Sequence, residues 1–420
     1  MNSTTVPAGV PIASHPASSP EPHAVPNPAP LPAGVFARLA RHAAAPHALS
    51  GACFALLMAV GLVSNGVGWL DGRLKLADPA PGWRQLMDAE PMQQLAKAMS
   101  DVPLSSAAAG WERSLSWLAL RDLGPRVREG QRDWLFLADE LTPHVAGEAS
   151  AASRAAEVVA LHKRLHAQGI DLLVAVVPDK SRIEAAHLGG LQRPAPFAGR
   201  VAQWTQSLEA AGVKAVDLSG VLDGLRHQGQ AAFLRTDSHW TEAGAQAAAG
   251  LVAQRARALA GIAATGSGWR LAGSSEQPRP GDLVRLAGLD RLPLSLQPLP
   301  ERAQLSRFER DGAAVTVATA AGKATPAAKV ANDDDLFGDA DLPRVALIGT
   351  SFSRTSQFEP FLARALDARI ANFALDGGDF AGAAKAYLAS PAFKQTPPRL
   401  VIWEIPERVL QADRRGDRVE

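Results

Sequence analysis

Two short segments of the sequence combine residue types that suit acyl transfer: TDSHW at 236–240 and GTSFS at 349–353. In the first, Asp237 lies two positions before His239, so its carboxylate can orient the imidazole of a general base. In the second, Ser351 lies at a turn and can act as a nucleophile whose proton that base removes. Each segment alone is more often an ordinary turn, but together they predict a triad of Ser351, His239 and Asp237.

Other residues compete for each of these roles. Ser353 is a second hydroxyl in the same turn, but Ser351 is favoured because it is closer to the preceding aliphatic run, and Gly349 allows a sharp turn there. The turn lacks the second glycine of the Gly-x-Ser-x-Gly nucleophile elbow, which argues against an ordinary α/β-hydrolase. His187 is a weaker alternative base. The competing interpretation of Asp237 is a turn residue that caps the following helix and has no part in catalysis.

Metal ligands are too few in this pattern to predict a metal site. Such a site needs three or more convergent ligands, and Asp237 with His239 supplies two. The acidic run at 333–335 lacks the glycine and glutamate spacing of an EF-hand loop and is expected to be a solvated loop. We therefore expect no metal and no cofactor.

The elements that must position these residues alternate between helix and strand. The expected strands lie at 133–137, 170–177, 213–217, 345–348, 369–373 and 400–403, and the expected helices at 153–168, 200–211, 241–260, 358–366 and 381–389. Continuous aliphatic strands that alternate with helices predict a three-layer α/β sandwich with a mainly parallel sheet. Functional residues gather at the carboxyl ends of such strands, and Ser351 follows the strand at 345–348.

Length and composition exclude some classes of function. The chain has 420 residues, of which 47% are hydrophobic, and this is enough for a large core. Its 43 basic and 42 acidic residues give a formal net charge of +1, and no basic tract is interleaved with aromatic residues. Nucleic acid is therefore not an expected partner. The single cysteine, Cys53, cannot form an intrachain disulfide.

The N-terminal part of the sequence predicts a membrane anchor. Residues 1–47 begin with a stretch rich in Pro, Ala and Ser and are expected to form a disordered cytoplasmic tail. Residues 48–70 carry no charge and are long enough to cross the hydrocarbon core of a membrane. Arg38 and Arg41 before this span favour a single pass through the inner membrane, with the catalytic domain in the periplasm. A cleaved signal peptide and a buried core helix are the competing interpretations.

The predicted catalytic domain follows a less regular segment. Residues 71–132 are expected to form a linker with an amphipathic helix near 114–121, and the domain itself is expected at 133–412. Within the domain, residues 272–341 are rich in proline, glycine and charge. That interval is expected to be an insertion or a set of long loops.

Six short motifs occur in a characteristic order along the chain. They are DWLFL at 133–137, VPDKSR at 177–182, TDSHWT at 236–241, GDL at 281–283, GTSFS at 349–353 and WEIPER at 403–408. This set resembles the AlgJ/AlgX-type alginate O-acetyltransferase family, which consists of periplasmic SGNH-hydrolase-like proteins that modify bacterial exopolysaccharides. The acid and the base precede the nucleophile, whereas ordinary SGNH hydrolases carry them near the C-terminus. That order favours this family over a generic esterase.

The resemblance implies a chemistry and a set of partners. Ser351 would take an acetyl group as an ester and pass it to a hydroxyl of an exopolysaccharide such as alginate. The acetyl group would arrive through a membrane-bound acyltransferase. Candidate oxyanion donors are the backbone N–H of Ser351, Asn372 and Gly378. Because no carbohydrate-binding module is recognised after the last strand, the chain is expected to be closer to the single-domain AlgJ-like members.

Two other functions stay open at this stage. A periplasmic carbohydrate esterase would use the same triad to remove acyl groups, and a non-catalytic subunit of an exopolysaccharide secretion complex would lack the triad geometry. Whether a sugar or water takes up the acyl group depends on how well the site excludes water and positions the acceptor. The sequence reveals neither of these. The polysaccharide, the acetylated hydroxyl and the oligomeric state are also left open.

Overall fold

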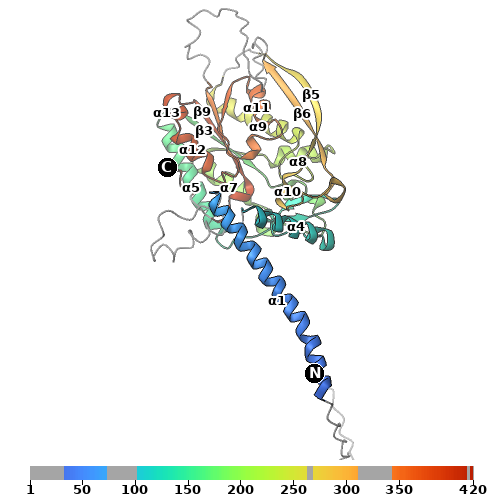
Figure 1. Cartoon of the computed structure of the whole chain (residues 1–420). Coiled ribbons are helices and arrows are strands. Elements are labelled where there is room, and N and C mark those ends of the chain that lie inside the picture. Colours follow the sequence, from blue (N-terminus) through green and yellow to red (C-terminus); the bar gives the residue numbers. More distant parts are fainter. Residues whose placement is uncertain (1–32, 73–101, 263–267, 311–342, 414–416, 420) are drawn as a thin grey trace, which may run out of the picture. The chain divides into compact units, whose positions relative to one another are not determined.

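The structure is a computed structural model that describes residues 33–72, 102–262, 268–310, 343–413 and 417–419 (Figure 1). The chain divides into two compact units, Met1–Ser105 and Ser106–Glu420. Three sequence predictions lie outside the described residues: the disordered tail over 1–32, the linker over 73–101 and the solvated acidic loop at 333–335.

In the first unit, the described residues 33–72 contain a long helix, α1 (Ala33–Leu70). Its segment Ser50–Leu70 is long and apolar enough to cross a membrane, and almost none of that segment is buried. The helix begins at Ala33, whereas the sequence predicts a disordered tail as far as residue 47, so this boundary is corrected. Residues 33–47 are rich in alanine, the residue with the highest helix propensity, although Pro46 removes one backbone hydrogen bond within this part of the helix.

The second unit is built on a five-stranded parallel sheet. Its strands are β3 (Asp171–Val177), β4 (Lys214–Asp217), β7 (Val345–Ile348), β8 (Ile370–Asn372) and β9 (Leu400–Pro406), in the order β4-β3-β9-β7-β8. Every neighbouring pair in this sheet is parallel. Because β9 lies between β3 and β7, the carboxyl ends of these three strands meet at one edge, where functional residues gather in such sheets.

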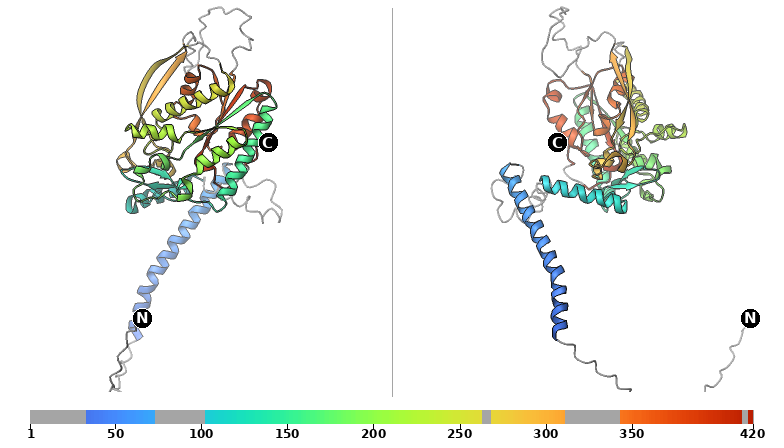
Figure 2. Two further views of the ribbon diagram at one scale, coloured as in Figure 1. Left: turned by 180° about the vertical axis from the view of Figure 1, so that it is seen from behind. Right: turned by 45° about the vertical axis from the view of Figure 1, so that its right-hand side comes forward.

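Helices cover both faces of the sheet (Figures 1 and 2). Alternate side chains of a strand point to opposite faces, so Ala175 and Val174 of β3 enter two different cores. The core of Ala175 is closed by α8 (Ser219–His227), α9 (Glu242–Ala260) and α11 (Phe358–Leu366). The core of Val174 is closed by α5 (Gly147–His166), α7 (Arg200–Ala210) and α12 (Gly382–Ala389). The predicted three-layer α/β sandwich is confirmed.

The helix after the predicted base shows how local sequence sets element ends. The side-chain oxygen of Thr241 accepts a hydrogen bond from the N–H of Gly244 at 3.1 Å, so Thr241 caps the N-terminus of α9. At the other end, Gly261 has a φ of +56°, the left-handed conformation that commonly terminates helices. Residues 236–240 are therefore held immediately before a well-capped helix.

Smaller elements surround the sandwich. The strands β1 (Val127–Glu129) and β2 (Leu135–Leu137) form a hairpin, and β5 (Trp269–Arg279) pairs with β6 (Glu301–Arg310) in a long antiparallel ribbon. The remaining helices are α4 (Pro103–Leu120), α6 (Lys180–Ile183), α10 (Asp282–Leu286) and α13 (Pro391–Gln395). Short 3-10 turns occur at η1 (Ala138–Glu140), η2 (Ala185–His187), η3 (Ala195–Phe197), η4 (Leu294–Leu296), η7 (Ser351–Ser353) and η8 (Glu407–Val409).

Two of these elements alter the predicted organisation. The hairpin partner β1 begins at Val127, ahead of the predicted domain start at 133, because the strand at 135–137 needs a neighbour to satisfy its backbone groups. In the interval 272–341, where the sequence predicts an insertion or long loops, the described residues contain α10, all of β6 and most of β5.

Candidate active site

The structure brings the three predicted residues into one hydrogen-bonded chain. The Oγ of Ser351 lies 2.6 Å from Nε2 of His239, and Nδ1 of His239 lies 2.6 Å from Oδ1 of Asp237. Because an ionised carboxylate only accepts hydrogen bonds, Nδ1 carries the ring hydrogen and Nε2 is left to accept from the serine hydroxyl. This arrangement can pass the serine proton to the imidazole.

Asp237 is held in its ionised form. Its Oδ1 also accepts from the backbone N–H of His239 at 3.0 Å, and its Oδ2 accepts from Nε of Arg279 at 2.9 Å. Burial alone would raise the pKa of Asp237, but the hydrogen bond from His239 and the charges of His239 and Arg279 hold that pKa well below its usual range. Asp237 is therefore a permanent negative charge that can stabilise the imidazolium formed during reaction.

The catalytic loop, residues 236–240, is fixed by a distant segment of the chain. Asp282, at the start of α10, accepts hydrogen bonds from the backbone N–H and the hydroxyl of Ser238 at 2.6 and 2.5 Å. The preceding residue, Gly281, approaches the loop so closely that an added Cβ would lie 1.9 Å from the carbonyl oxygen of Thr236. Any larger residue at 281 would displace the loop that carries the base.

A buried lysine also holds this loop. Nζ of Lys180, in α6, donates to the backbone carbonyls of Leu135, Arg235 and Asp237 at 2.6, 2.8 and 3.1 Å. The lysine is 1% exposed, and this burial lowers the pKa of Lys180 to about 8. One ammonium group therefore ties strand β2 and the catalytic loop together.

The turn that carries Ser351 follows β7 and is fixed by Glu404 of β9. The carboxylate of Glu404 accepts from the backbone N–H of Thr350 at 2.7 Å, from its hydroxyl at 3.0 Å and from the hydroxyl of Ser353 at 3.1 Å. Ser353 is completely buried in this contact, which supports Ser351 as the nucleophile. Gly349 provides space rather than a special turn conformation, because an added Cβ would lie 2.5 Å from Oε2 of Glu404.

The candidate oxyanion donors differ in availability. The backbone N–H of Ser351 donates to no acceptor among the residues that the structure describes. Nδ2 of Asn372 donates one hydrogen to the carbonyl of Ser353 at 3.0 Å and retains a second. The single N–H hydrogen of Gly378 is used by the carbonyl of Leu375 at 3.1 Å. The geometry therefore favours Ser351 and Asn372 over Gly378.

A cleft of about 490 Å³ opens onto the triad. Its walls include Arg279 and Arg285, which come from the end of β5 and from α10. Arg279 is bonded to Asp237, whereas the exposed side chain of Arg285 makes no ion pair or hydrogen bond within the described part of the chain. Arg285 is thus a cation that can bind an anionic group entering the cleft.

The cleft also contains the one group of three clustered potential metal ligands found among the described residues. The ligand atoms of Asp237, His239 and Asp282 lie within 4.8 Å of one another. Both carboxylates already accept hydrogen bonds, from Arg279 and from Ser238, and the guanidinium of Arg279 would repel a cation. This donor set suits a hydrogen-bonded relay better than a metal site.

The alternative base and the tryptophan that follows His239 do not line the cleft. His187, the weaker candidate base, stacks on Trp134 with ring centroids 4.1 Å apart. Trp240 is fully buried and stacks on Phe358 at 4.8 Å, so it packs the catalytic loop against α11. Neither residue can contact a substrate held at Ser351.

Comparison with known proteins places the chain in a family. The family described as SGNH hydrolase-like domain, acetyltransferase AlgX, matches residues 127–407. The chain belongs to this family. The resemblance predicted from the six sequence motifs is therefore confirmed, and so is the SGNH-like fold class.

Relatives of this AlgX-type chain include proteins named probable alginate O-acetylase AlgJ. The one from Pseudomonas aeruginosa is 30% identical over 313 residues, which cover 74% of this chain and 77% of the relative. The one from Azotobacter vinelandii is 32% identical over 313 residues, with coverage of 74% and 76%. The solved O-acetyltransferase domain of Pseudomonas putida AlgJ matches with a TM-score of 0.57 and 28% identity, covering 70% of this chain and 94% of that one.

Two motifs of the AlgX-type domain, VPDKSR and WEIPER, meet in a buried ion network. Glu407 pairs with Arg182, Arg193 and Arg200 at 2.6, 2.5 and 3.1 Å, and Asp179 pairs with Arg193 and Arg200 at 3.0 and 2.5 Å. Burial alone would raise the pKa of Glu407, but the hydrogen bond from Arg182 and the charges of Arg193 and Arg200 lower it to about 2. Burial and the neighbouring charge of Glu407 raise the pKa of Asp179 to about 8, so Glu407 carries the negative charge of the network near neutral pH. The network joins the carboxyl ends of β3 and β9, directly beside Lys180.

Replacing Glu407 by glutamine is expected to lower the free energy of unfolding by about 3–5 kcal/mol near neutral pH, because buried guanidinium groups lose a counter-charge. The pKa of Glu407 is about 2 in the folded chain against about 4.5 when unfolded, so its stabilising contribution is present above pH 4.5 and is lost as the pH falls through 2. The difference between variant and wild type should therefore shrink in acid.

Urea unfolding of the detergent-solubilised full chain, followed by circular dichroism over this pH range, measures that difference. The control is Glu148→Gln in the exposed first turn of α5, which should cost less than about 1 kcal/mol because only a favourable interaction with the helix dipole is lost. A Glu407→Gln effect that stays constant down to the lowest pH would contradict this account of the network.

Four residues that shape the site were not predicted from the sequence: Lys180, Arg279, Asp282 and Glu404. Three of them lie within the motifs on which the predicted family resemblance rests, VPDKSR, GDL and WEIPER, and these motifs are the signal that could have identified them. Arg279 has no comparable signal, because its contact with Asp237 depends on where the ribbon β5–β6 folds back.

Proposed function

We propose that this chain is a membrane-anchored periplasmic O-acetyltransferase that transfers acetyl groups to hydroxyls of an exopolysaccharide such as alginate through an acetyl ester on Ser351. The observation that carries the proposal is the hydrogen-bonded chain from Ser351 through His239 to Asp237, open to a cleft. Family membership and the names of the AlgJ relatives support acetyl transfer as the reaction and alginate as the acceptor.

In the first half-reaction, Oγ of Ser351 attacks the carbonyl carbon of the donor acetyl group while Nε2 of His239 takes the hydroxyl proton. The negative charge on the carbonyl oxygen is stabilised by the N–H of Ser351 and by the second amide hydrogen of Asn372. When the bond to the donor breaks, the leaving group takes the proton from the imidazolium. The carboxylate of Asp237 stabilises that imidazolium throughout.

In the second half-reaction, a sugar hydroxyl attacks the acetyl ester on Ser351 and gives its proton to Nε2 of His239. The ester bond to Oγ then breaks, Oγ recovers the proton, and the acetylated sugar leaves. Water can follow the same route and would make the enzyme an esterase. A sugar held in the cleft favours transfer because it occupies the place from which water would attack.

The apolar helix Ser50–Leu70 supports membrane anchoring, and the basic residues that precede it support a cytoplasmic N-terminus. Under this proposal the domain 127–412 works in the periplasm, close to the inner membrane. A membrane-bound acyltransferase then supplies the acetyl group from the cytoplasmic side, because activated acetyl donors are made there. We propose such a protein as the donor partner.

Arg285 supports an acidic acceptor. Alginate is a polyuronate, so each sugar carries a carboxylate that the exposed guanidinium of Arg285 can bind beside Ser351. Replacing Arg285 by alanine is expected to raise KM for alginate oligosaccharides about 10-fold, since a hydrogen bond to a charged group contributes about 1.5 kcal/mol or more. Hydrolysis of an uncharged aryl acetate should be unchanged.

Acetylation kinetics with the full chain measure this effect, and Arg226→Ala on the exposed face of α8 serves as the matched control because Arg226 does not line the cleft. Equal KM values for wild type and Arg285→Ala would remove Arg285 from acceptor recognition. A matching loss of aryl acetate hydrolysis would instead point to damage at the triad.

One assay separates the proposed transferase from its alternatives. The purified full chain in detergent is incubated with an aryl acetate and alginate oligosaccharides, and products are followed by mass spectrometry. Acetylated sugar is the expected product. Acetate release with no acetylated sugar would support the esterase, and no turnover at all would support a non-catalytic subunit.

A further inference from the structure

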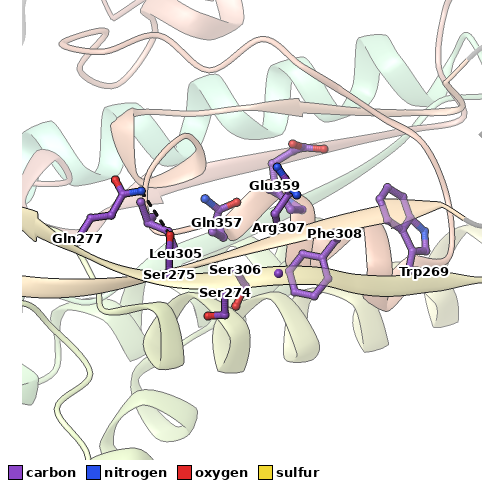
Figure 3. Close-up of a pocket in the computed structure, with 12 residues that line it drawn as sticks. Trp269, Ser274, Ser275, Gln277, Leu305, Ser306, Arg307, Phe308, Gln357 and Glu359 are labelled. Atoms are coloured by element: carbon purple, nitrogen blue, oxygen red, sulfur yellow. Dashed lines mark hydrogen bonds between the residues drawn. The ribbon is translucent and has the colours of Figure 1, made fainter. Parts of the chain in front are cut away.

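A second cavity, of about 600 Å³, lies between the ribbon β5–β6 and the start of α11 (Figure 3). Figure 3 shows Gln277 and Trp269 at opposite ends of the group of residues that line it, with Phe308 near Trp269. Phe308 also packs edge-on against Phe361 of α11 at 5.1 Å, so the ribbon is fastened to the body at that end. The cavity is thus a built feature between two packed elements.

This cavity adjoins the catalytic cleft. Gln277 of β5 and Leu305 of β6 line both, so the two spaces are neighbours along the ribbon. From Gln277 to Trp269 the strand advances eight residues, or roughly 26 Å at the rise of a β-strand, a span that accommodates about five sugar units of a linear polysaccharide. A groove therefore runs from Ser351 along the ribbon to Trp269.

We infer that this groove, residues 269–277 and 305–308 with 357–360, binds successive sugars of a linear polysaccharide acceptor while one sugar lies at Ser351. This inference rests on the proposed function and extends it to the acceptor's length. The acetyl group itself needs only the cleft, so the additional space serves the acceptor chain. An open groove on the surface admits the middle of a polymer as well as its end.

The groove walls have the chemistry that sugar chains require. The hydroxyl of Ser275 and the amide of Gln357 can exchange hydrogen bonds with sugar hydroxyls. Trp269 adds an aromatic surface at the far end. Exposed Arg307, which lies 3.9 Å from Glu309, adds a positive charge, and the cavity is also lined by Glu359, whose pKa is raised by burial. These groups are spread along the groove rather than gathered at one point, as expected for a repeating ligand.

Gly273 offers a way to block the groove without disturbing the fold. It lines the cavity, and an added Cβ at this position meets no heavy atom within 4 Å. The variant Gly273→Phe should therefore fill the groove, while Gly273→Ala should leave it open. Trp269→Ala provides a second test at the far end, where it removes a contact and adds no bulk.

The experiment measures kcat/KM of the full chain in detergent for alginate oligosaccharides of increasing length, with an aryl acetate as donor. For wild type and Gly273→Ala, kcat/KM is expected to rise with length until about five sugars. For Gly273→Phe this gain should be lost, at least 10-fold for the longest acceptor, with the shortest acceptor and aryl acetate hydrolysis unchanged. For Trp269→Ala, kcat/KM should stop rising only for the longest acceptors, which reach the far end of the groove.

Different outcomes of this experiment test the proposed function and the groove. No acetylated sugar from wild type with any acceptor would overturn the proposed function. Acetylated sugar with the same length dependence in wild type, Gly273→Phe and Trp269→Ala would overturn the groove and leave the proposed function standing. Equal losses on short and long acceptors would likewise reject the groove, because the damage would then lie at the catalytic cleft.

Discussion

Replacing Ser351 by alanine is expected to abolish acetyl transfer, with kcat falling by roughly 10⁴-fold or more, because no other group can take its place as the nucleophile. The neighbouring hydroxyl of Ser353 cannot substitute, since it is completely buried and donates to Glu404. Residual turnover should come only from direct attack by water or sugar in the cleft. Mass spectrometry of acetylated oligosaccharide measures the loss.

The matched control for this change is Ser353→Ala. It removes a hydroxyl from the same turn and one hydrogen bond to Glu404, at a cost of about 1 kcal/mol of stability, but leaves the bond between Ser351 and His239 in place. This variant should keep most of its activity. If Ser351→Ala retained activity while Ser353→Ala lost it, the assignment of the nucleophile would be wrong.

Replacing Asp237 by asparagine is expected to lower kcat by roughly 10³- to 10⁴-fold with little change in KM. The amide cannot accept from both Nδ1 of His239 and Nε of Arg279 as the carboxylate does, and a neutral group cannot stabilise the imidazolium. If the amide donates to the ring, Nε2 carries the hydrogen and cannot take the proton of Ser351.

Asp282→Asn is the comparison for that variant. Asp282 lies 3.5 Å from Nδ1 of His239, but its main hydrogen bonds go to Ser238, so it positions the loop and does not orient the ring directly. Its loss should cost about 10-fold in kcat, far less than the change at Asp237. Reversed magnitudes would show that Asp282 is the carboxylate that supports the base.

Much of the sheet could be predicted because its strands are continuous aliphatic runs. The stretch 172–177 is buried on both faces of the sheet, and its residues are apolar for this reason, which makes the strand visible in the sequence. The three triad residues could also be predicted, because Asp237 and His239 are neighbours in the chain and Ser351 follows a recognisable strand. Their contact across the fold needed the structure.

The ribbon β5–β6 could not be predicted in the same way. Most of its side chains are at least partly exposed, and β5 contains Gly273 and Pro278, residues that are unfavourable in strands. Pairing of the two strands across about twenty intervening residues satisfies their backbone groups, and the sequence of either strand alone does not reveal that partner. The groove beneath the ribbon was hidden for the same reason.

The glycine at 281 illustrates a similar limit. From the sequence it is one glycine in a segment with many turn residues, and nothing local requires it. A glycine is needed at 281 because Thr236, 45 positions earlier in the chain, lies very close. The carbonyl oxygen of Thr236 would lie 1.9 Å from an added Cβ. Contacts of this kind depend on how distant segments of the chain pack together. The local pattern of hydrophobic residues does not predict that packing.

The central claim is that Ser351 carries the acetyl group during transfer. The most direct measurement is mass spectrometry of the full chain after brief exposure to an aryl acetate and an acid quench, without acceptor. The account predicts one acetyl group on the peptide that contains Ser351, its absence in Ser351→Ala and His239→Ala, and its disappearance when alginate oligosaccharide is added before the quench. Acetyl groups on another residue, or acetylated sugar formed by Ser351→Ala, would contradict it.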